Sequence, residues 1–200
     1  MMLPTHAVVG LALAAPLAAV APNLATAVLT GAVIGSVFPD LDLYAGHRRT
    51  LHYPTTYAAL AVLAATAAAI VSTPLVVGVA AFLVGAAVHC RMDRYGGGLE
   101  LRPWEGNSEK AVYDHVRGQW RRPKRWIEYD GSPRDLLVLT VLAVPLLVVL
   151  NGPFQVIVVA CLVIGTTYTV LRRRLAAIAP VVFAFVPNRL TQYIPKRYRP

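Results

Sequence analysis

The sequence is poor in charged residues, and they are missing altogether from three long stretches. Asp, Glu, Lys and Arg make up 14% of the 200 residues, whereas a soluble domain usually carries about 25%. None of them occurs within 1–39, 53–90 or 136–171. Uncharged stretches of this length exclude an ordinary soluble domain and are typical of a polytopic membrane protein.

Cysteines and acidic residues are also scarce. The two cysteines, Cys90 and Cys161, lie at or inside apolar stretches, which does not indicate a disulfide framework. Basic residues outnumber acidic ones by 19 to 10, giving a formal net charge of +9. A basic balance can indicate nucleic-acid binding, but here the positive charges flank the apolar stretches. We therefore attribute them to membrane topology and expect membrane lipids, rather than nucleic acid, as partners.

A short turn sequence containing proline divides each uncharged stretch into two helices. We predict an all-α polytopic membrane protein with about six transmembrane helices arranged as three hairpins. The expected spans are 6–21, 24–38, 54–71, 75–90, 135–150 and 154–171. Their lengths lie near the lower limit for crossing the hydrocarbon core of a bilayer.

The distribution of charge predicts the orientation of these spans. The three hairpin turns carry no charged residue, whereas the opposite side holds Arg48 and Arg49, the segment 91–134 and the arginines at 172–174. By the positive-inside rule that side is cytoplasmic. We therefore expect a multi-pass protein of the cell membrane with both termini in the cytoplasm.

The predicted spans and their orientation divide the chain into four parts. Residues 1–92 form a four-span bundle, 93–134 a cytoplasmic basic loop and 135–174 a two-span hairpin. The apolar part of 175–200 is short and contains two prolines, so we expect an interfacial or re-entrant segment. Its basic end, which includes Lys196, Arg197 and Arg199, suits an anionic lipid surface.

Residue types that bind metals occur at the cytoplasmic ends of the first four spans. An up-and-down bundle returns these ends to one face, so residues more than eighty positions apart become candidates for one site. His89 and Asp93 also lie one helical turn apart. Each residue alone fits an interfacial or loop role, and only the combination favours a shared site. The candidate ligands are His6, Asp40, His52, His89 and Asp93, with Asp42 and His47 beside them.

The same residues, in the same order, resemble a known family. The segments are His6, Phe38-Pro39-Asp40-Leu41-Asp42, His47-Arg48, His52 and His89-Cys90-Arg91-Met92-Asp93. They are similar to the YdjM-like membrane-bound metal-dependent hydrolases, also described as LexA-binding, inner membrane-associated hydrolases. The resemblance covers roughly residues 1–105. Leu51 and Tyr53 stand where the family has Thr and Ser, so two hydroxyls that would orient a ligand or substrate are missing.

The resemblance implies a metal-dependent hydrolase. His6, Asp40, His52, His89 and Asp93 would be metal ligands, and mixed imidazole and carboxylate ligands suit one or two Zn²⁺ ions, with Mn²⁺ or Fe²⁺ as alternatives. Asp42 or His47 would be a further ligand, an orienting group or the general base, and Arg48 would neutralise substrate charge. The substrate would be a phosphoester or a lipid-linked phosphate.

Two other functions fit parts of the sequence. A non-catalytic membrane scaffold could recruit a protein or nucleic-acid partner through the basic loop. A transporter is less well supported, because the interior of the spans contains no Asp, Glu, Lys or Arg that would line an ion path.

The basic loop itself contains two notable segments. Gly96-Gly97-Gly98 follows Asp93 and is either a lid over the metal site or a flexible connector. Aromatic and basic residues alternate around His115 and over 120–126, a pattern that favours anchoring at lipid headgroups over nucleic-acid binding.

Overall fold

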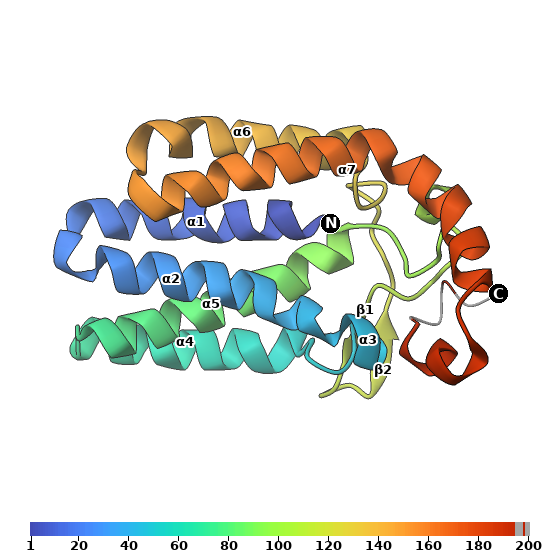
Figure 1. Ribbon diagram of the computed structural model, residues 1–200. Helices are drawn as coiled ribbons and strands as arrows, with labels where there is room; N and C mark the ends of the chain where they lie inside the picture. The colour runs from blue at the N-terminus through green and yellow to red at the C-terminus, as the bar shows by residue number, and fades with distance from the viewer. Residues whose placement is uncertain (195–197, 199–200) are drawn as a thin grey trace.

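The computed structural model describes residues 1–194 and 198. Long helices lie side by side in a bundle, with tight turns at one end and with the loops, a β-hairpin, the N-terminus and the end of α7 at the other (Figure 1). The helices in chain order are α1 (Leu3–Val20), α2 (Ala25–Val37), α3 (Leu43–Gly46), α4 (Pro54–Ile70), α5 (Pro74–Tyr95), α6 (Pro133–Val149) and α7 (Gly152–Ala184). The 3₁₀ turns are η1 (Pro22–Leu24), η2 (Phe38–Asp42), η3 (Pro103–Glu105) and η4 (Asn188–Tyr193), and the strands are β1 (Val112–Asp114) and β2 (Gln119–Arg121). The all-α membrane-type fold is therefore confirmed.

The helices begin where the sequence places proline and a capping residue. Pro54, Pro74 and Pro133 each occupy the first turn of a helix, where the missing N–H costs nothing. Thr73 caps α5 by accepting a hydrogen bond from a main-chain N–H, and Ser132 caps α6 in the same way. These signals fix the turns that make the helices run as hairpins.

Four of the helical segments are long and apolar enough to cross a membrane: 3–20, 22–42, 74–95 and 152–184. The α4 helix is apolar but has 17 residues, and α6 has the same length. Many of the exposed side chains of these helices are large and apolar, as lipid contact requires. The membrane character is thus clear, while the count of six spans stays a prediction.

The α2 and α5 helices touch through glycine. A Cβ atom on Gly35 would lie 2.0 Å from the carbonyl oxygen of Phe82, and one on Gly31 would lie 2.2 Å from the carbonyl oxygen of Gly78. No larger residue fits at either position. Such small residues let helix backbones approach closely in membranes, where packing rather than the hydrophobic effect joins helices.

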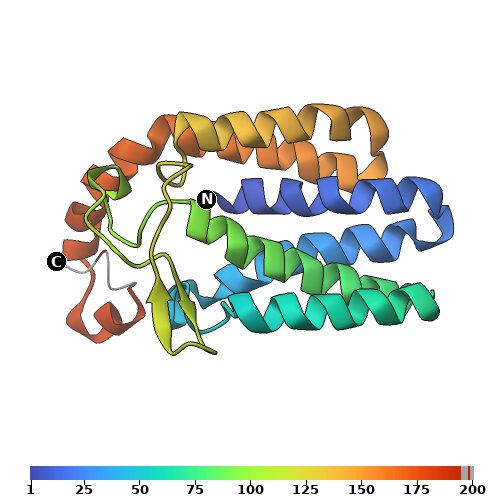
Figure 2. The same ribbon diagram turned by 180° about the vertical axis from the view of Figure 1, so that it is seen from behind.

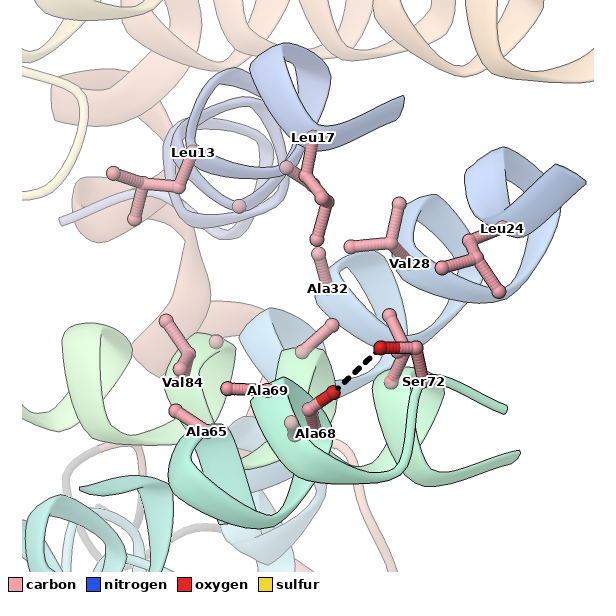
Figure 3. A pocket seen from close by; sticks show the side chains of 16 residues that line it. Leu13, Leu17, Leu24, Val28, Ala32, Ala65, Ala68, Ala69, Ser72 and Val84 are labelled. Atoms are coloured by element: carbon pink, nitrogen blue, oxygen red, sulfur yellow. Dashed lines mark hydrogen bonds between the residues drawn. The ribbon is translucent and has the colours of Figure 1, made fainter. Parts of the chain in front are cut away.

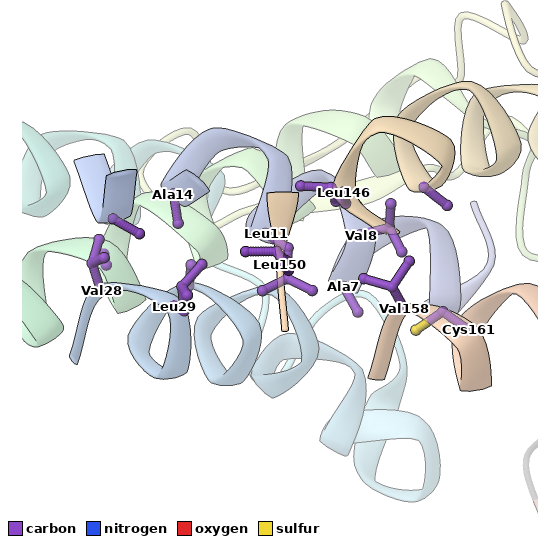
Figure 4. Close-up of a cluster of buried hydrophobic side chains, with 14 of the residues drawn as sticks. Ala7, Val8, Leu11, Ala14, Val28, Leu29, Leu146, Leu150, Val158 and Cys161 are labelled. Carbon is purple, nitrogen blue, oxygen red and sulfur yellow. The ribbon is translucent and has the colours of Figure 1, made fainter. Parts of the chain in front are cut away.

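The α1 helix lies between α2 and the α6–α7 pair, and its buried side chains join the two halves of the bundle. Figure 4 shows this apolar core, in which residues of α1 and α2 meet residues of α6 and α7. The core includes Ala7, Val8, Leu11, Leu29, Leu146, Leu150, Val158 and Cys161.

A buried carboxylate fixes the start of α1 against α6. Asp135 accepts hydrogen bonds from the Met2 main-chain N–H at 2.8 Å, the Thr5 hydroxyl at 2.7 Å and the Gly131 N–H at 3.1 Å. This role of Asp135 was not predicted from the sequence. Its effect is to hold the first turn of α1, which carries His6, in one position.

An apolar cavity of about 400 Å³ lies between α1, α2, α4 and α5 (Figure 3). Gly10 and Gly85 line its end nearest the loops, one helical turn from His6 and His89. There a Cβ on Gly10 would lie 2.2 Å from Ser36 Oγ, and one on Gly85 would lie 2.9 Å from Ser36 N. This close packing of Gly10 and Gly85 against Ser36 lies between the cavity and the side chains of His6 and His89.

The C-terminal helix differs from the prediction. We expected a span over 154–171 and an interfacial or re-entrant segment from 175; α7 instead continues as one helix of 33 residues, and the position of its end relative to the membrane stays a prediction. Within it, Arg172 is buried and pairs with Asp130 at 3.2 Å, whereas Arg173 and Arg174 are exposed. At about 1.5 Å per residue α7 is about 50 Å long, more than a bilayer core requires, and it extends past the other helices (Figure 1). Lys196, Arg197 and Arg199 lie outside the described residues.

The β-hairpin was not predicted. Its strands β1 and β2 pair antiparallel, with Tyr113 opposite Trp120, and Gly118 supplies the positive φ of 64° at the turn. Figure 2 shows the hairpin beside the start of α4, where Thr55 donates a hydrogen bond to Asp114 at 3.1 Å. Burial disfavours the charged form of Asp114, but the hydrogen bonds from Arg121 and Thr55 outweigh burial and lower its pKa.

Candidate metal centre

The loop end of the bundle brings the predicted ligands together. His6 lies in the first turns of α1, Asp40 in η2 after α2, and His52 just before α4. His89 and Asp93 lie in the last turns of α5. Each of these segments ends or begins at the same end of the bundle, as the hairpin arrangement requires.

Four of these residues form one compact group. Asp40, His52, His89 and Asp93 each offer a nitrogen or oxygen atom, and these four atoms all lie within 4.8 Å of one another. His52 Nε2 is 3.1 Å and His89 Nε2 is 3.4 Å from Asp93 Oδ2, and Asp40 Oδ1 is 3.4 Å from His89 Nε2. This group, called the metal group below, could hold a metal ion.

Hydrogen bonds on the far side of each imidazole ring set the direction of its lone pair. His89 Nδ1 lies 2.7 Å from the main-chain carbonyl of Ser36, which can only accept, so Nδ1 carries the proton. His52 Nδ1 likewise donates to Asp42 Oδ2 at 2.9 Å. In the neutral rings both Nε2 atoms are therefore acceptors, as metal-binding histidines require.

The two acceptor nitrogens face each other. His52 Nε2 and His89 Nε2 are 3.2 Å apart, and Asp93 Oδ2 lies within 3.4 Å of both. Lone pairs gathered this closely in a buried place repel one another unless a cation lies among them. The arrangement of these residues thus fits a bound metal ion.

Protons can supply part of that positive charge. Burial disfavours the charged form of His52, but its hydrogen bonds with Asp42 and Asp93 outweigh burial and raise its pKa above the ordinary value. A metal ion and a proton therefore compete for His52 Nε2.

His6 lies beside the metal group rather than within it. Its ring stacks on that of His89, with the centroids 3.8 Å apart, and His6 Nε2 is 3.3 Å from Asp93 Oδ1. The side chain is buried, and neither ring nitrogen makes a hydrogen bond among the described residues. A buried imidazole without a hydrogen bond is costly, and Nε2 faces Asp93, so His6 is placed to serve a further ligand position beside that carboxylate.

Asp42 faces away from the metal group. It is buried, and its carboxylate accepts hydrogen bonds from the main-chain N–H groups of Arg48, Arg49 and Leu51, at 3.1–3.2 Å, and from His52. The same carboxylate lies 3.2 Å from His47 Nδ1. With its oxygens occupied in this way, Asp42 orients His52 and the loop that precedes it.

Arg48 is placed differently from the expectation that it contacts substrate. Its residue is 6% exposed, its NH2 group lies 3.3 Å from Asp93 Oδ1, and its NH1 group donates to the Gly97 carbonyl at 2.9 Å. Its φ of 60° lies in the left-handed region, a strained conformation for a residue with a side chain. These contacts neutralise Asp93 and fasten the glycine segment to the site.

The site opens at one edge. The side chains of Asp40 and His47 are 21% and 19% exposed, whereas those of His6, His52, His89 and Asp93 are 2% exposed or less. His47 Nδ1 is 3.8 Å from Asp40 Oδ1. A molecule from the loop side would therefore meet Asp40 and His47 first.

The structure shows the surroundings of two loop features, His115 and the segment Gly96-Gly97-Gly98. His115 lies outside the metal group, because its Nε2 atom contacts the Arg49 carbonyl at 2.7 Å and its ring stacks on Tyr53. The segment Gly96-Gly97-Gly98 packs against 124–129, and a Cβ on Gly97 would lie 2.7 Å from the Glu128 carbonyl. The glycines thus allow a close approach of two backbones beside Arg48.

Comparison with known proteins identifies the family. Residues 1–186 match the family described as YdjM inner membrane protein, so the chain belongs to that family. The predicted resemblance is confirmed, and it extends beyond residue 105 into α7. No curated protein and no solved structure matches the chain. The family and the apolar helices together indicate a membrane protein.

Proposed function

We propose that the protein is a membrane-embedded metal-dependent hydrolase that acts at the cytoplasmic face on a phosphoester or a lipid-linked phosphate. The observation that carries this proposal is the pair of imidazoles whose Nε2 atoms face each other and two carboxylates, with an opening beside Asp40 and His47. A purely structural polar cluster would have no need to leave the acceptor atoms of His52 and His89 facing one another.

Asp40, His52, His89 and Asp93 would hold the ion, and His6 is placed for a second ion or a fifth position. Two imidazoles and two carboxylates favour Zn²⁺, with Mn²⁺ or Fe²⁺ as alternatives. A bound divalent ion supplies Lewis-acid activation of a phosphoryl oxygen and of water.

The side chains around the ion would have different roles in the reaction. His47 stands at the exposed edge next to Asp40, so it is the group best placed to accept a proton from the attacking water. Asp42 orients His52 and is not available as a base, because its oxygens are already occupied. Arg48 keeps Asp93 ionised and in place rather than binding substrate.

The location of the site supports a substrate at the membrane surface. The metal group lies at the end of the apolar helices where the loops and the N-terminus gather (Figure 1), and this end carries most of the arginines. We therefore place it in the cytoplasm, by the positive-inside rule. A lipid-linked phosphate would present its phosphate at this depth.

Metal content of the detergent-purified protein is the first test. Elemental mass spectrometry should find about one or two equivalents of a transition metal in the wild type, and none in His52→Ala/His89→Ala. His115→Ala is the matched control and should keep its metal, since His115 lies outside the metal group. Protein without metal after reconstitution would overturn the proposal and leave a non-catalytic scaffold as the better reading.

Hydrolysis is the second test. Release of inorganic phosphate is measured from phosphatidic acid in mixed micelles and from a soluble aryl phosphate. His47→Asn should lose about 100-fold in rate while keeping its metal, because general base catalysis typically contributes that much. Equal rates for His47→Asn and wild type would remove His47 from the mechanism.

A further inference from the structure

A second cavity, lined by both basic and apolar residues, lies on the other side of α5, between α4, α5 and the β-hairpin. Its volume is about 360 Å³, and Arg91 and Arg94 line it. At 100° per residue, Arg91 is turned about 200° away from His89 on the helix and Arg94 about 100° away from Asp93. This arginine groove is therefore separate from the metal group.

The groove carries positive charge that no acidic side chain balances. Among the described residues, neither Arg91 nor Arg94 has a carboxylate oxygen within 4.0 Å, and Arg94 Nε is buried without a hydrogen-bond partner. The third arginine of the lining, Arg121, pairs with Asp114 at 2.8 Å and holds the hairpin wall in place. Arg91 NH2 donates a hydrogen bond to the Tyr95 hydroxyl at 3.2 Å, but no carboxylate neutralises Arg91 or Arg94, so both cationic side chains can pair with an anion.

The opposite half of the lining is apolar. Ala58 of α4 and Ala87 and Val88 of α5 form its wall on the membrane side. Because two of these residues are alanines, the groove between the helices leaves room for a hydrocarbon chain. Cationic and apolar walls thus meet within one groove at the end of membrane-type helices.

Aromatic residues continue this surface along the end of α5. Arg91 and Lys124 lie over the ring of Tyr95, at 5.4 Å and 5.0 Å from its centroid. Lys124 also lies over the ring of Trp126, which is 64% exposed. Exposed Trp and Tyr beside basic side chains are typical of the headgroup level of a membrane.

We propose that the arginine groove binds the phosphate of an anionic membrane lipid, with one acyl chain lying along Ala58 and Ala87. Arginine recognises phosphate oxygens through paired N–H donors, and Arg94 is already partly desolvated. The apolar wall distinguishes a lipid from a nucleic acid, which would leave that wall uncovered. This site is independent of hydrolysis at the metal group.

Native mass spectrometry of the full chain in detergent tests the proposal, with phosphatidylglycerol or phosphatidylcholine as the added lipid. The wild type should bind phosphatidylglycerol more tightly than phosphatidylcholine. Arg91→Gln/Arg94→Gln should weaken phosphatidylglycerol binding about 30-fold, at roughly fivefold for each arginine. The control Arg102→Gln/Arg122→Gln removes the same charge from exposed arginines that pair with glutamates, and it should change binding less than threefold or so.

A second pair of variants tests the acyl-chain wall without changing charge. Ala58→Trp should fill the groove and weaken phosphatidylglycerol binding, whereas Ala59→Trp, at an equally exposed position outside the groove lining, should not. Equal binding by all variants, or no preference for the anionic lipid, would overturn the proposal. Displacement of the lipid by millimolar inorganic phosphate would also overturn it, because the groove would then be a site for free phosphate.

Discussion

Asp42→Asn tests whether metal affinity depends on a residue that does not touch the metal. The carboxylate receives the Nδ1 proton of His52 and three main-chain N–H groups. An amide has one oxygen, so its NH₂ group faces three of these donors, His52 included, when it replaces Oδ2, and faces the Arg48 N–H beside His47 Nδ1 when it replaces Oδ1. Removal of an orienting carboxylate behind a metal-binding histidine usually costs 10–100-fold in affinity, or about 1.4–2.8 kcal/mol.

The assay is competition with a chromophoric chelator in detergent, together with thermal unfolding of the metal-free protein. Asp114→Asn is the matched control, because Asp114 is equally buried and also holds main-chain N–H groups, but it contacts Arg121 rather than a histidine. Both variants should unfold at a lower temperature, and only Asp42→Asn should bind metal more weakly. Wild-type metal affinity in Asp42→Asn would refute the argument that Asp42 sets the direction of the His52 lone pair.

Three further outcomes are expected. Removing the metal with a chelator should lower the unfolding temperature, since an ion at 100 times its dissociation constant stabilises by about 2.7 kcal/mol; an unchanged temperature would contradict a bound ion. Arg48→Met should make the segment 96–111 more sensitive to limited proteolysis, because Arg48 holds the Gly97 carbonyl, whereas Arg49→Met should not. Gly35→Leu should destabilise the bundle and lower metal occupancy, because its Cβ would collide with the Phe82 carbonyl. The control Ala59→Leu, at an exposed position of α4, should behave as wild type.

The helical hairpins and the grouping of ligands were predictable because they follow from strong local signals. Charge-free stretches divided by proline-containing turns predict helices that return to the same end, and the observed bounds of α4 and α5 differ from the predicted ones by a few residues at most. Once the helices return, His52 and His89 must come to one face. No long-range information was needed for that step.

The division of roles between Asp40 and Asp42 was not predictable from their spacing. Both lie in η2, where about three residues make a turn, so side chains two positions apart point in different directions. Asp40 therefore faces His89, while Asp42 faces the back of His52 and the following loop. An α-helix continued through the same residues would have given another pairing. The role of Arg48 was hidden for a similar reason, because its left-handed backbone directs it inward.

The packing that positions His89 was hidden by the composition of the spans. In sequence, Gly31 and Gly35 indicate only that small residues are tolerated in a membrane helix. In the structure they bring α2 against α5, and this contact places the Ser36 carbonyl 2.7 Å from His89 Nδ1. That carbonyl fixes the tautomer of His89, and hence the direction of the nitrogen that faces the metal group. The glycine packing inside the membrane and the geometry of the metal group at its surface are therefore one structural unit, so we expect Gly35→Leu to reduce metal affinity although it alters no polar residue.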